Sequence, residues 1–386
     1  MGIKGLSTTL KIINEQSKIP GIVDTHVTNL VTLCTNHDNN KANIRIAIDF
    51  MELAYHWVGT DDFEFITNCF KFLKLIINAR ITPIFCFDGM PPDEKNNVID
   101  IRRQRRLGYS KRATYLSDKI ESISSGEHYV TKDTTINLSK KLKVAIIRSR
   151  KITPKYCEMF KYILDNLGMD YIHDPNIEGG ELLCAQLQRY GHVSYCMTND
   201  LDVFAMGATI VIRNFNLKTG NCTVYNRLIL MQQANLSIPQ FIDMCILHGC
   251  DYIDRPKGMR INMILPLIQK YNTIQGVMLN WDKLYPNYDI SFPDGYNPTS
   301  ARRMFSTPIV NSVLYWDSSN NMSAIFSNIN NSTILDIVDN FMKKYPHMSR
   351  VCIFTSMFSI LVCAQNIYST QPAFHLPNKY IILNTQ

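Results

Sequence analysis

The stretch Tyr195-Cys-Met-Thr-Asn-Asp-Leu-Asp-Val-Phe204 is the part of the sequence that best indicates the fold. A short apolar run, Val193 to Met197, ends abruptly in an acidic loop that carries Asp200 and Asp202. This pattern predicts a buried strand over 192–198 that stops at the loop. Side chains alternate along an extended backbone, so we expect the two carboxylates to point the same way.

Two further apolar strands end in aspartate, Ile44–Asp49 and Thr82–Asp88. In open α/β sheets, sites form outside the carboxyl ends of the strands, so one anionic pocket is expected there. Clustered carboxylates repel one another, and a divalent cation removes that repulsion. Oxygen ligands suit Mg²⁺ or Mn²⁺. Taken singly, each aspartate also fits a helix cap or a plain turn, so the metal hypothesis depends on their conjunction.

Composition limits the class of protein. The 386 residues are 46% hydrophobic, enough for one large domain or two ordinary ones. The eleven cysteines include no C-x-x-C pair, which favours reduced thiols in a cytosol-like compartment over a disulfide frame or a zinc site. The N-terminus has no secretory apolar core. The apolar run that begins at Val351 is too short to span a bilayer, so no membrane partner is expected.

The remaining pattern alternates strands and helices. Helices are predicted from Ser7, around 23–34, over 62–80, 154–168, 182–190, from Pro239, within 257–271, and over 334–344 and 349–366. Further strands are predicted over 169–172, 209–213 and 222–225, the last two as a hairpin. The polar stretch 121–138 is expected to be a mobile tip.

A basic segment follows the third acidic strand. Residues 95–112 carry seven positive side chains and one negative one, and four of the arginines are expected on a helix. A charge run of this kind often marks only a solvated face. Beside an acidic metal pocket it also fits a surface that contacts phosphates. A second basic cluster consists of Lys140, Lys141, Lys143, Arg148, Arg150 and Lys151.

The motifs of this sequence, taken in order, resemble those of the flap endonuclease family of structure-specific 5′ nucleases, and within it the poxvirus flap-endonuclease-like branch. The similar motifs are Met1–Leu6, Ile46–Asp49 followed by Tyr55, Phe87–Pro92, Glu181–Leu187, Thr198–Asp202 and Cys245–Tyr252. The resemblance runs from residue 1 to about 280, and the last third of the chain carries no motif.

The resemblance implies a PIN-like α/β core with a mainly parallel central sheet. It also implies an arch of about residues 90–150 and a helix-turn-helix of about 250–275, within a nuclease core of 1–280. Residues 281–386 would form a mainly helical extension packed on that core. Two Mg²⁺ ions, replaceable by Mn²⁺, would be held by Asp49, Asp88, Glu178, Glu181, Asp200, Asp202 and Asp251.

The same resemblance assigns residues to the substrate. Lys95 and Arg102 would lean from the arch onto the scissile phosphate as catalytic groups, and Tyr55 would stack on the adjacent base. Gly2 would pack near the site. We also expect Arg103, Arg105, Arg106, Lys257 and Arg260 to bind nucleic acid.

Three departures from the family pattern stand out. Two residues separate Glu178 from Glu181 where the family has one, so Glu178 is a direct ligand, a ligand through water, or only a helix-capping acid. Arg260 replaces the second glycine of a Gly-x-Gly phosphate-binding turn, which makes a monovalent cation doubtful there. We find no sliding-clamp peptide with paired aromatics.

The expected function is therefore a Mg²⁺-dependent nuclease acting on branched or ended DNA in replication, recombination and repair. The protein would act in the cytoplasm, on a genome kept there, and this would be the host cytoplasm if the protein is viral. Replication or recombination proteins would be its partners. The alternatives are a Holliday-junction resolvase of the same family, a catalytically silent DNA-binding scaffold, and a PIN-type ribonuclease.

Overall fold

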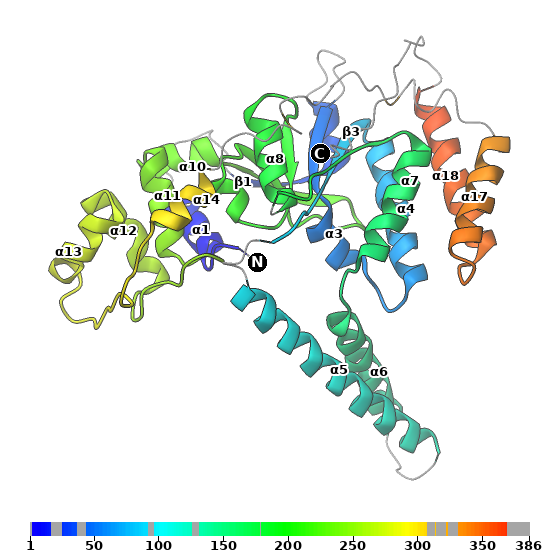
Figure 1. The fold of residues 1–386 in the computed structure, drawn as a ribbon, viewed down its shortest axis with the longest axis horizontal. Helices are drawn as coiled ribbons and strands as arrows, with labels where there is room; N and C mark the ends of the chain where they lie inside the picture. Colours follow the sequence, from blue (N-terminus) through cyan, green and yellow to red (C-terminus); the bar gives the residue numbers. More distant parts are fainter. Residues whose placement is uncertain are drawn as a thin grey trace.

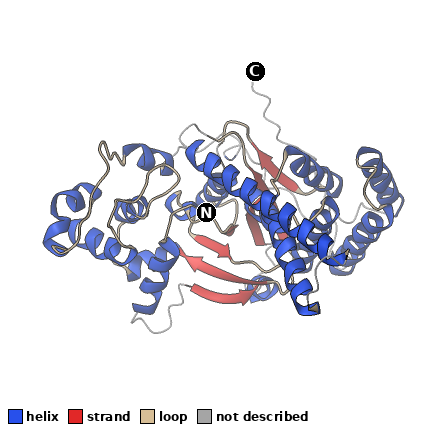
Figure 2. Ribbon diagram, turned by 90° about the horizontal axis from the view of Figure 1, so that it is seen from below, coloured by secondary structure: helices blue, strands red, loops and turns tan. Residues whose placement is uncertain are grey.

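A computed structural model describes residues 2–16, 25–36, 44–91, 96–125, 131–177, 179–306, 313, 322 and 331–368. Its centre is a mixed, mainly parallel sheet of seven strands in the order β1-β7-β6-β5-β2-β3-β4, with helices on both faces (Figures 1 and 2). The expected α/β class with a mainly parallel sheet is confirmed. Within the described residues, no helix is long and apolar enough to cross a membrane.

The middle of the sheet is parallel. The strands are β2 (Ile44–Asp49), β3 (Ile81–Phe87), β4 (Asp170–His173), β5 (Tyr195–Met197) and β6 (Ile210–Arg213). Every residue of β3 is buried, as expected for a strand covered by helices on both faces. Pro83 is tolerated in it because the pairing with β4 starts only at Ile84.

The sheet's other edge is antiparallel. β7 (Asn221–Asn226) pairs with β6 on one side and with β1 (Thr25–Asn29) on the other. The helix predicted over 23–34 is therefore wrong in its first half. Thr25–Asn29 is a pairing strand rich in β-branched residues, and α2 (Leu30–Asn36) begins only after Asn29 accepts a hydrogen bond from the N–H of Val31.

Two cores form because strand side chains alternate between the faces. Ile46 and Ile48 of β2 join one core, and Ala47 between them joins the other. Helices α3 (Phe50–Trp57), α4 (Asp62–Asn78) and α7 (Pro154–Leu167) cover the first face, together with α17 (Asn331–Lys344) and α18 (Arg350–Tyr368). Lys74 of α4 donates a 2.8 Å hydrogen bond to Ser359 of α18.

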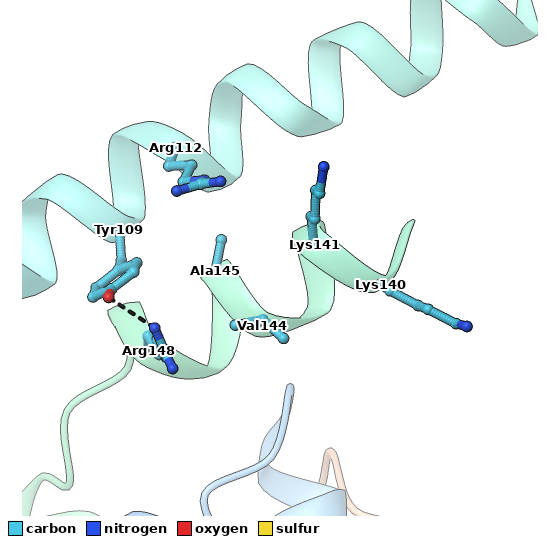
Figure 3. A pocket seen from close by; sticks show the side chains of 7 residues that line it. All are labelled: Tyr109, Arg112, Lys140, Lys141, Val144, Ala145 and Arg148. Carbon is cyan, nitrogen blue, oxygen red and sulfur yellow. Dashed lines mark hydrogen bonds between the residues drawn. The ribbon is translucent and has the colours of Figure 1, made fainter. Parts of the chain in front are cut away.

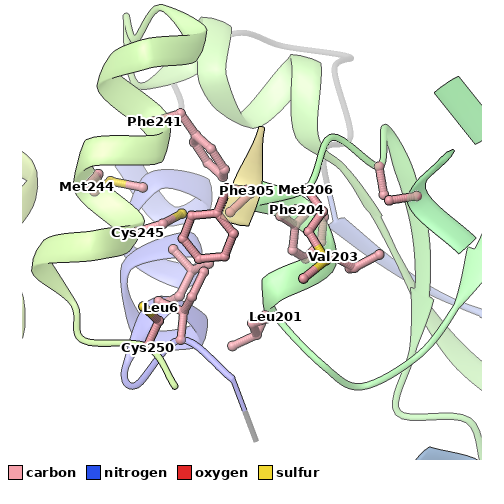
Figure 4. Packing of buried hydrophobic residues seen from close by; sticks show 14 of the residues in the cluster. Leu6, Leu201, Val203, Phe204, Met206, Phe241, Met244, Cys245, Cys250 and Phe305 are labelled. Carbon is pink, nitrogen blue, oxygen red and sulfur yellow. The ribbon is translucent and has the colours of Figure 1, made fainter. Parts of the chain in front are cut away.

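The second face is covered by a larger set of helices, part of whose packing is shown in Figure 4. They are α1 (Leu6–Gln16), α8 (Gly180–Arg189), α9 (Asp202–Ala205), α10 (Arg227–Gln233), α11 (Ile238–Leu247), α12 (Ile261–Tyr271), α13 (Ile274–Leu284) and α14 (Thr299–Phe305). Phe204 of α9 and Phe241 of α11 are fully buried there. This packing fixes the loop after β5 against α11, the helix that leads to Asp251.

Two long helices, α5 (Asn96–Ser124) and α6 (Lys132–Ser149), pack against each other and project from the body as the arch (Figure 1). The tip predicted over 121–138 is wrong for most of its length. Helix α5 continues to Ser124, and α6 starts at Lys132 because Thr131 accepts a hydrogen bond from the N–H of Thr134.

Candidate active site

Neighbouring strands deliver carboxylates to one edge of the sheet. Asp49 ends β2, Asp88 follows β3, and Asp200 lies in the loop after β5. β3 and β5 flank β2 in parallel, so these three strand ends share an edge. The order of the strands reverses at β2, which is where open α/β sheets form their sites.

Asp49 is the most constrained member of this group. Only 3% of its surface is exposed. Its Oδ1 accepts a 3.1 Å hydrogen bond from the N–H of Glu52, and its Oδ2 accepts a 2.8 Å bond from the hydroxyl of Thr198. Burial, followed by the charges of Asp88 and Glu181, raises the pKa of Asp49 well above its usual range. A bound cation would relieve that cost.

Because Gly180 has no side chain, Asp88 and Asp49 can lie close to the start of α8. Its N–H donates a 2.8 Å hydrogen bond to Oδ1 of Asp88. An added Cβ would lie 2.7 Å from the carbonyl oxygen of Cys86 and 3.3 Å from Oδ1 of Asp49. Helix α8 begins at this glycine, so Glu181 lies in its first turn and is 7% exposed. Glu178 lies outside the described residues, so its role stays a prediction.

Gly2 packs directly on the two aspartates of the starting stretch. An added Cβ on Gly2 would lie 1.9 Å from Oδ1 of Asp200 and 2.7 Å from Oδ1 of Asp202. Both carboxylates therefore face the same neighbour, as expected. The expected reason is wrong, because Leu201 between them is helical, with φ −84° and ψ −14°, and Asp202 starts α9. The N–H of Asp202 instead donates to Oδ1 of Asp200 at 3.1 Å.

The base of the arch reaches the acidic residues. Nη2 of Arg102 lies 3.0 Å from Oδ2 of Asp251, which follows α11. Burial raises the pKa of Tyr55, while the positive charges of Arg106 and Arg102 oppose that rise and the charge of Asp88 adds to it. Tyr55 therefore lies between the arginines of the arch and the acidic edge of the sheet.

The other predicted nucleic-acid residues lie further out. Arg103 and Arg105 are exposed, whereas Arg102 and Arg106, one helical turn apart, are half-buried. Lys257 and Arg260 are exposed on the connection between α11 and α12, and the guanidinium of Arg260 lies 5.0 Å from the ring centre of Tyr288. Lys95 lies outside the described residues.

Sequence reasoning missed a polar network behind the aspartates. Oε1 of Glu52 accepts 2.9 Å hydrogen bonds from Nδ2 of Asn199 and from His56. The carbonyl oxygen of Asn199 accepts a 2.8 Å bond from Nη2 of Arg213, which is 8% exposed. The helical spacing of Glu52 behind Asp49 could have indicated the first partner, but nothing local points to Arg213.

The donor set fits a hard divalent cation. Every predicted ligand that the structure describes offers carboxylate oxygens, which suit Mg²⁺ or Mn²⁺. Among the described residues, no three Asp, Glu, His or Cys side chains already converge as a coordination group. Protein donors already hold several of the carboxylates, for example Asp88, which accepts from Gly180, and Asp251, which accepts from Arg102. Metal binding would exchange such partners for the ion.

Comparison with known proteins also points to a nuclease. Residues 168–251 match the XPG I-region family. Flap endonuclease 1 of Glycine max is 29% identical over 283 residues, covering 69% of this chain and 68% of that protein. The catalytic core of Rad2 shares the fold with a TM-score of 0.56 at 17% identity, covering 93% of this chain and 99% of that one.

A second solved structure, human GEN1 in complex with Holliday junction DNA, has a TM-score of 0.58 at 15% identity. It covers 95% of this chain and 79% of that one. The matched I-region spans β4, α8, β5 and the approach to Asp251, and so contains Glu181, Asp200 and Asp202. By the family match, the sequence relatives and the fold, this chain is similar to the XPG and flap endonuclease 1 structure-specific nucleases.

Proposed function

We propose that this protein is a Mg²⁺-dependent nuclease that hydrolyses phosphodiesters in DNA near 5′ flaps, strand ends or junctions. The observation that carries the proposal is the gathering of Asp49, Asp88 and Glu181, in which burial and then the charges of Asp88 and Glu181 raise the pKa of Asp49. A bound cation would offset both the burial and the repulsion of these carboxylates.

The metal would be held by Asp49, Asp88, Glu181, Asp200, Asp202 and Asp251, with Glu178 as a weaker or indirect ligand. Two Mg²⁺ ions, or Mn²⁺ in their place, would activate a water and stabilise the leaving 3′ oxygen. Arg102 would exchange Asp251 for the oxygens of the reacting phosphate and neutralise their developing charge. Lys95 is proposed for the same task.

Selection would follow the shape of the DNA. A stacked base pair cannot bring its phosphate into such a pocket, and unpairing the terminal nucleotides costs a few kcal/mol. Stacking on Tyr55 would return roughly 1–3 kcal/mol. Arg103, Arg105, Arg106, Lys257 and Arg260 would contact backbone phosphates, which carry no sequence information.

The similarity to human GEN1, solved with Holliday junction DNA, supports junction resolution as a second candidate function. Symmetric cutting of a junction needs two active sites, so dimerisation on that DNA would favour it. A silent scaffold and a ribonuclease are weaker candidates. Every cysteine whose side chain the structure describes is a free thiol, which supports the proposed cytoplasmic setting. The poxvirus branch and replication or recombination partners also stay proposals.

One experiment tests the function. End-labelled flap, nick, gap and four-way-junction DNAs, with a matched RNA flap, are incubated with the protein in Mg²⁺ and in EDTA. We expect Mg²⁺-dependent cleavage near the branch of DNA. The double variant Asp200→Asn/Asp202→Asn should lose cleavage and bind DNA in EDTA equally or more tightly, because two negative charges are removed. Retained turnover of the double variant at saturating Mg²⁺ would refute metal catalysis at this site.

A further inference from the structure

Two adjacent side chains attach the loop after β5, which carries Asp200, to helix α3. The hydroxyl of Thr198 donates a 2.8 Å hydrogen bond to Oδ2 of Asp49, the residue that caps α3. Nδ2 of Asn199 donates a 2.9 Å bond to Oε1 of Glu52, which lies in the first turn of that helix. The loop is therefore held against the start of α3 at two successive points.

Asn199 also attaches the loop to the neighbouring strand. Its Oδ1 accepts a 2.6 Å hydrogen bond from the N–H of Asn214, and its carbonyl oxygen accepts a 2.8 Å bond from Nη2 of Arg213. Arg213 ends β6, and Asn214 follows it. Because a backbone N–H can only donate, Oδ1 must face Asn214 and Nδ2 must face Glu52. The amide thus uses its acceptor toward β6 and its donor toward α3.

The position of Asp200 depends on this attachment. Its N–H donates a 3.0 Å hydrogen bond to the hydroxyl of Thr198, and its Oδ1 accepts a 3.1 Å bond from the N–H of Asp202. Both bonds lie within the loop, so a shift of the loop carries Asp200 with it. Ligands of a metal ion must be held to within about 0.5 Å of their working positions. A bond that fixes the loop against α3 therefore also fixes the spacing between Asp200 and Asp49.

The fold alone does not account for a glutamate at position 52. Its side chain is 13% exposed, and Nε2 of His56 lies 2.9 Å from Oε1. Its other oxygen, Oε2, is buried and accepts no hydrogen bond from the residues that the structure describes. A buried carboxylate oxygen without a donor costs free energy of folding. What the carboxylate provides is a charged acceptor, which makes the bond from Asn199 roughly twice as strong as a neutral acceptor would.

We propose that Glu52 is a positioning residue of the metal site, which acts through Asn199 to hold Asp200 at a fixed spacing from Asp49. Glu52 itself would contact neither the metal nor DNA. The inference rests on the proposed function, because it takes Asp49 and Asp200 as metal ligands. Removal of a group that orients metal ligands through hydrogen bonds typically lowers metal affinity by about 10- to 100-fold. Loss of the bond between Glu52 and Asn199 should therefore weaken metal binding even without DNA.

The test exchanges the two partners of this bond. Asn199→Asp removes the donor, keeps the acceptor for Asn214 and adds a negative charge beside the metal site. That charge alone would strengthen Mn²⁺ binding, whereas lost positioning would weaken it. We expect Asn199→Asp to bind Mn²⁺ at least about tenfold more weakly than the wild type, as measured by electron paramagnetic resonance of free Mn²⁺ without DNA.

The exchanged pair Glu52→Gln/Asn199→Asp restores the bond with its direction reversed, because the glutamine amide donates to the aspartate. Its net charge equals that of the wild type. We expect its Mn²⁺ affinity to return to within about threefold of the wild-type value. A larger loss would overturn the inference. The same holds if Asn199→Asp alone does not fold, as thermal melting in EDTA would show, since the exchanged pair then decides by itself.

Two variants control for the added charge. Asn214→Asp places it at an exposed position next to Asn199 and leaves the backbone N–H of residue 214 and the bond to Glu52 in place. Val144→Asp places it on the arch, at an exposed position in the wall of the cavity of about 270 Å³ between α5 and α6 (Figure 3). Neither should weaken Mn²⁺ binding. A loss in Asn214→Asp equal to that in Asn199→Asp would overturn the inference, since the bond to Glu52 would then not be responsible.

The outcomes separate this inference from the proposed function. If the wild type binds Mn²⁺ and Asn199→Asp binds it as tightly or more tightly, the positioning role is overturned and the nuclease stands. If Mn²⁺ binding is lost in Asn199→Asp and recovered in the exchanged pair, but the wild type cleaves no DNA, the nuclease is refuted and the positioning role stands. Where the wild type cleaves, Asn199→Asp should need more Mg²⁺ for half-maximal rate, and the exchanged pair should not.

Discussion

Arg102 donates from Nη2 to Oδ2 of Asp251 at 3.0 Å, across 149 positions of sequence, and so joins the arch to the loop after α11. The arginine side chain is 33% exposed and the aspartate 8% exposed. The two groups have different proposed partners, a phosphate for Arg102 and a metal for Asp251. Each neutralises the other in this structure, so substrate and metal would compete with the same ion pair.

Removing Arg102 should slow the chemical step. Arg102→Ala is expected to lower the single-turnover cleavage rate about a hundredfold or more, as loss of a donor to a developing charge typically does. Arg106→Ala, one helical turn away, is the control, and should mainly weaken DNA binding and flatten its salt dependence. If both changes altered only salt-dependent affinity, Arg102 would be a positioning residue.

The same ion pair gives a prediction for the DNA-free protein. Arg102→Ala should bind Mn²⁺ more tightly than the wild type, because Asp251 loses its competing partner. Electron paramagnetic resonance of free Mn²⁺ measures this directly, with Arg106→Ala expected to match the wild type. Weaker Mn²⁺ binding by Arg102→Ala would show that Asp251 needs the arginine to hold its position.

Gly2 should be intolerant of a side chain. Its φ of +78° favours glycine, and an added Cβ would lie 1.9 Å from Oδ1 of Asp200. Gly2→Ala should therefore displace the aspartate, reduce cleavage severely and raise the Mg²⁺ concentration needed for half-maximal rate. Gly108→Ala is the matched control, since a Cβ there meets nothing within 4 Å. Wild-type cleavage by Gly2→Ala would show that the N-terminal segment moves away in the active state.

The acidic edge was predictable because a short local sequence pattern specifies each of its strands. Apolar runs that end in aspartate specify β2, β3 and β5, and parallel pairing then brings Asp49, Asp88 and Asp200 to one edge. Arg213 was not predictable in the same way. It reaches Asn199 only because β6 pairs with β5, and a lone arginine at a strand end has many other uses.

The errors in the sequence analysis have physical causes. Thr25–Asn29 is a strand because β7 offers it a partner 190 or more positions away, which no local pattern reveals. Residues 121–124 and 132–138 of the polar stretch are helical because α5 and α6 support each other along their length, whereas isolated polar helices are marginal.

Glu181 and Glu178 should differ as ligands. Glu181 is nearly buried in the first turn of α8 and contributes to the raised pKa of Asp49. Glu181→Gln should therefore cause a large loss of single-turnover rate at any Mg²⁺ concentration. For Glu178→Gln we expect a smaller loss, partly rescued by high Mg²⁺ or Mn²⁺. The reverse order would assign the direct contact to Glu178.

His248 should make the fold sensitive to mild acid. It is fully buried at the end of α11, 3.0 Å from the hydroxyl of Thr9 in α1. Burial, helped by the charge of Arg255, lowers the pKa of His248 from 6.5 to about 4. Between these values the unfolded chain binds the extra proton, so stability is complete above about pH 6.5 and is lost as the pH falls toward 4.

The full loss would be about 3 kcal/mol, of which most is reached by pH 5. Urea unfolding at pH 7.5 and pH 5 measures it, and His248→Gln should reduce the difference. His56→Gln is the control. The hydrogen bond to Glu52 raises the pKa of His56, so that residue adds stability on acidification and its removal cannot reduce the loss. An unchanged pH dependence in His248→Gln would mean that the histidine is hydrated or charged in the folded protein.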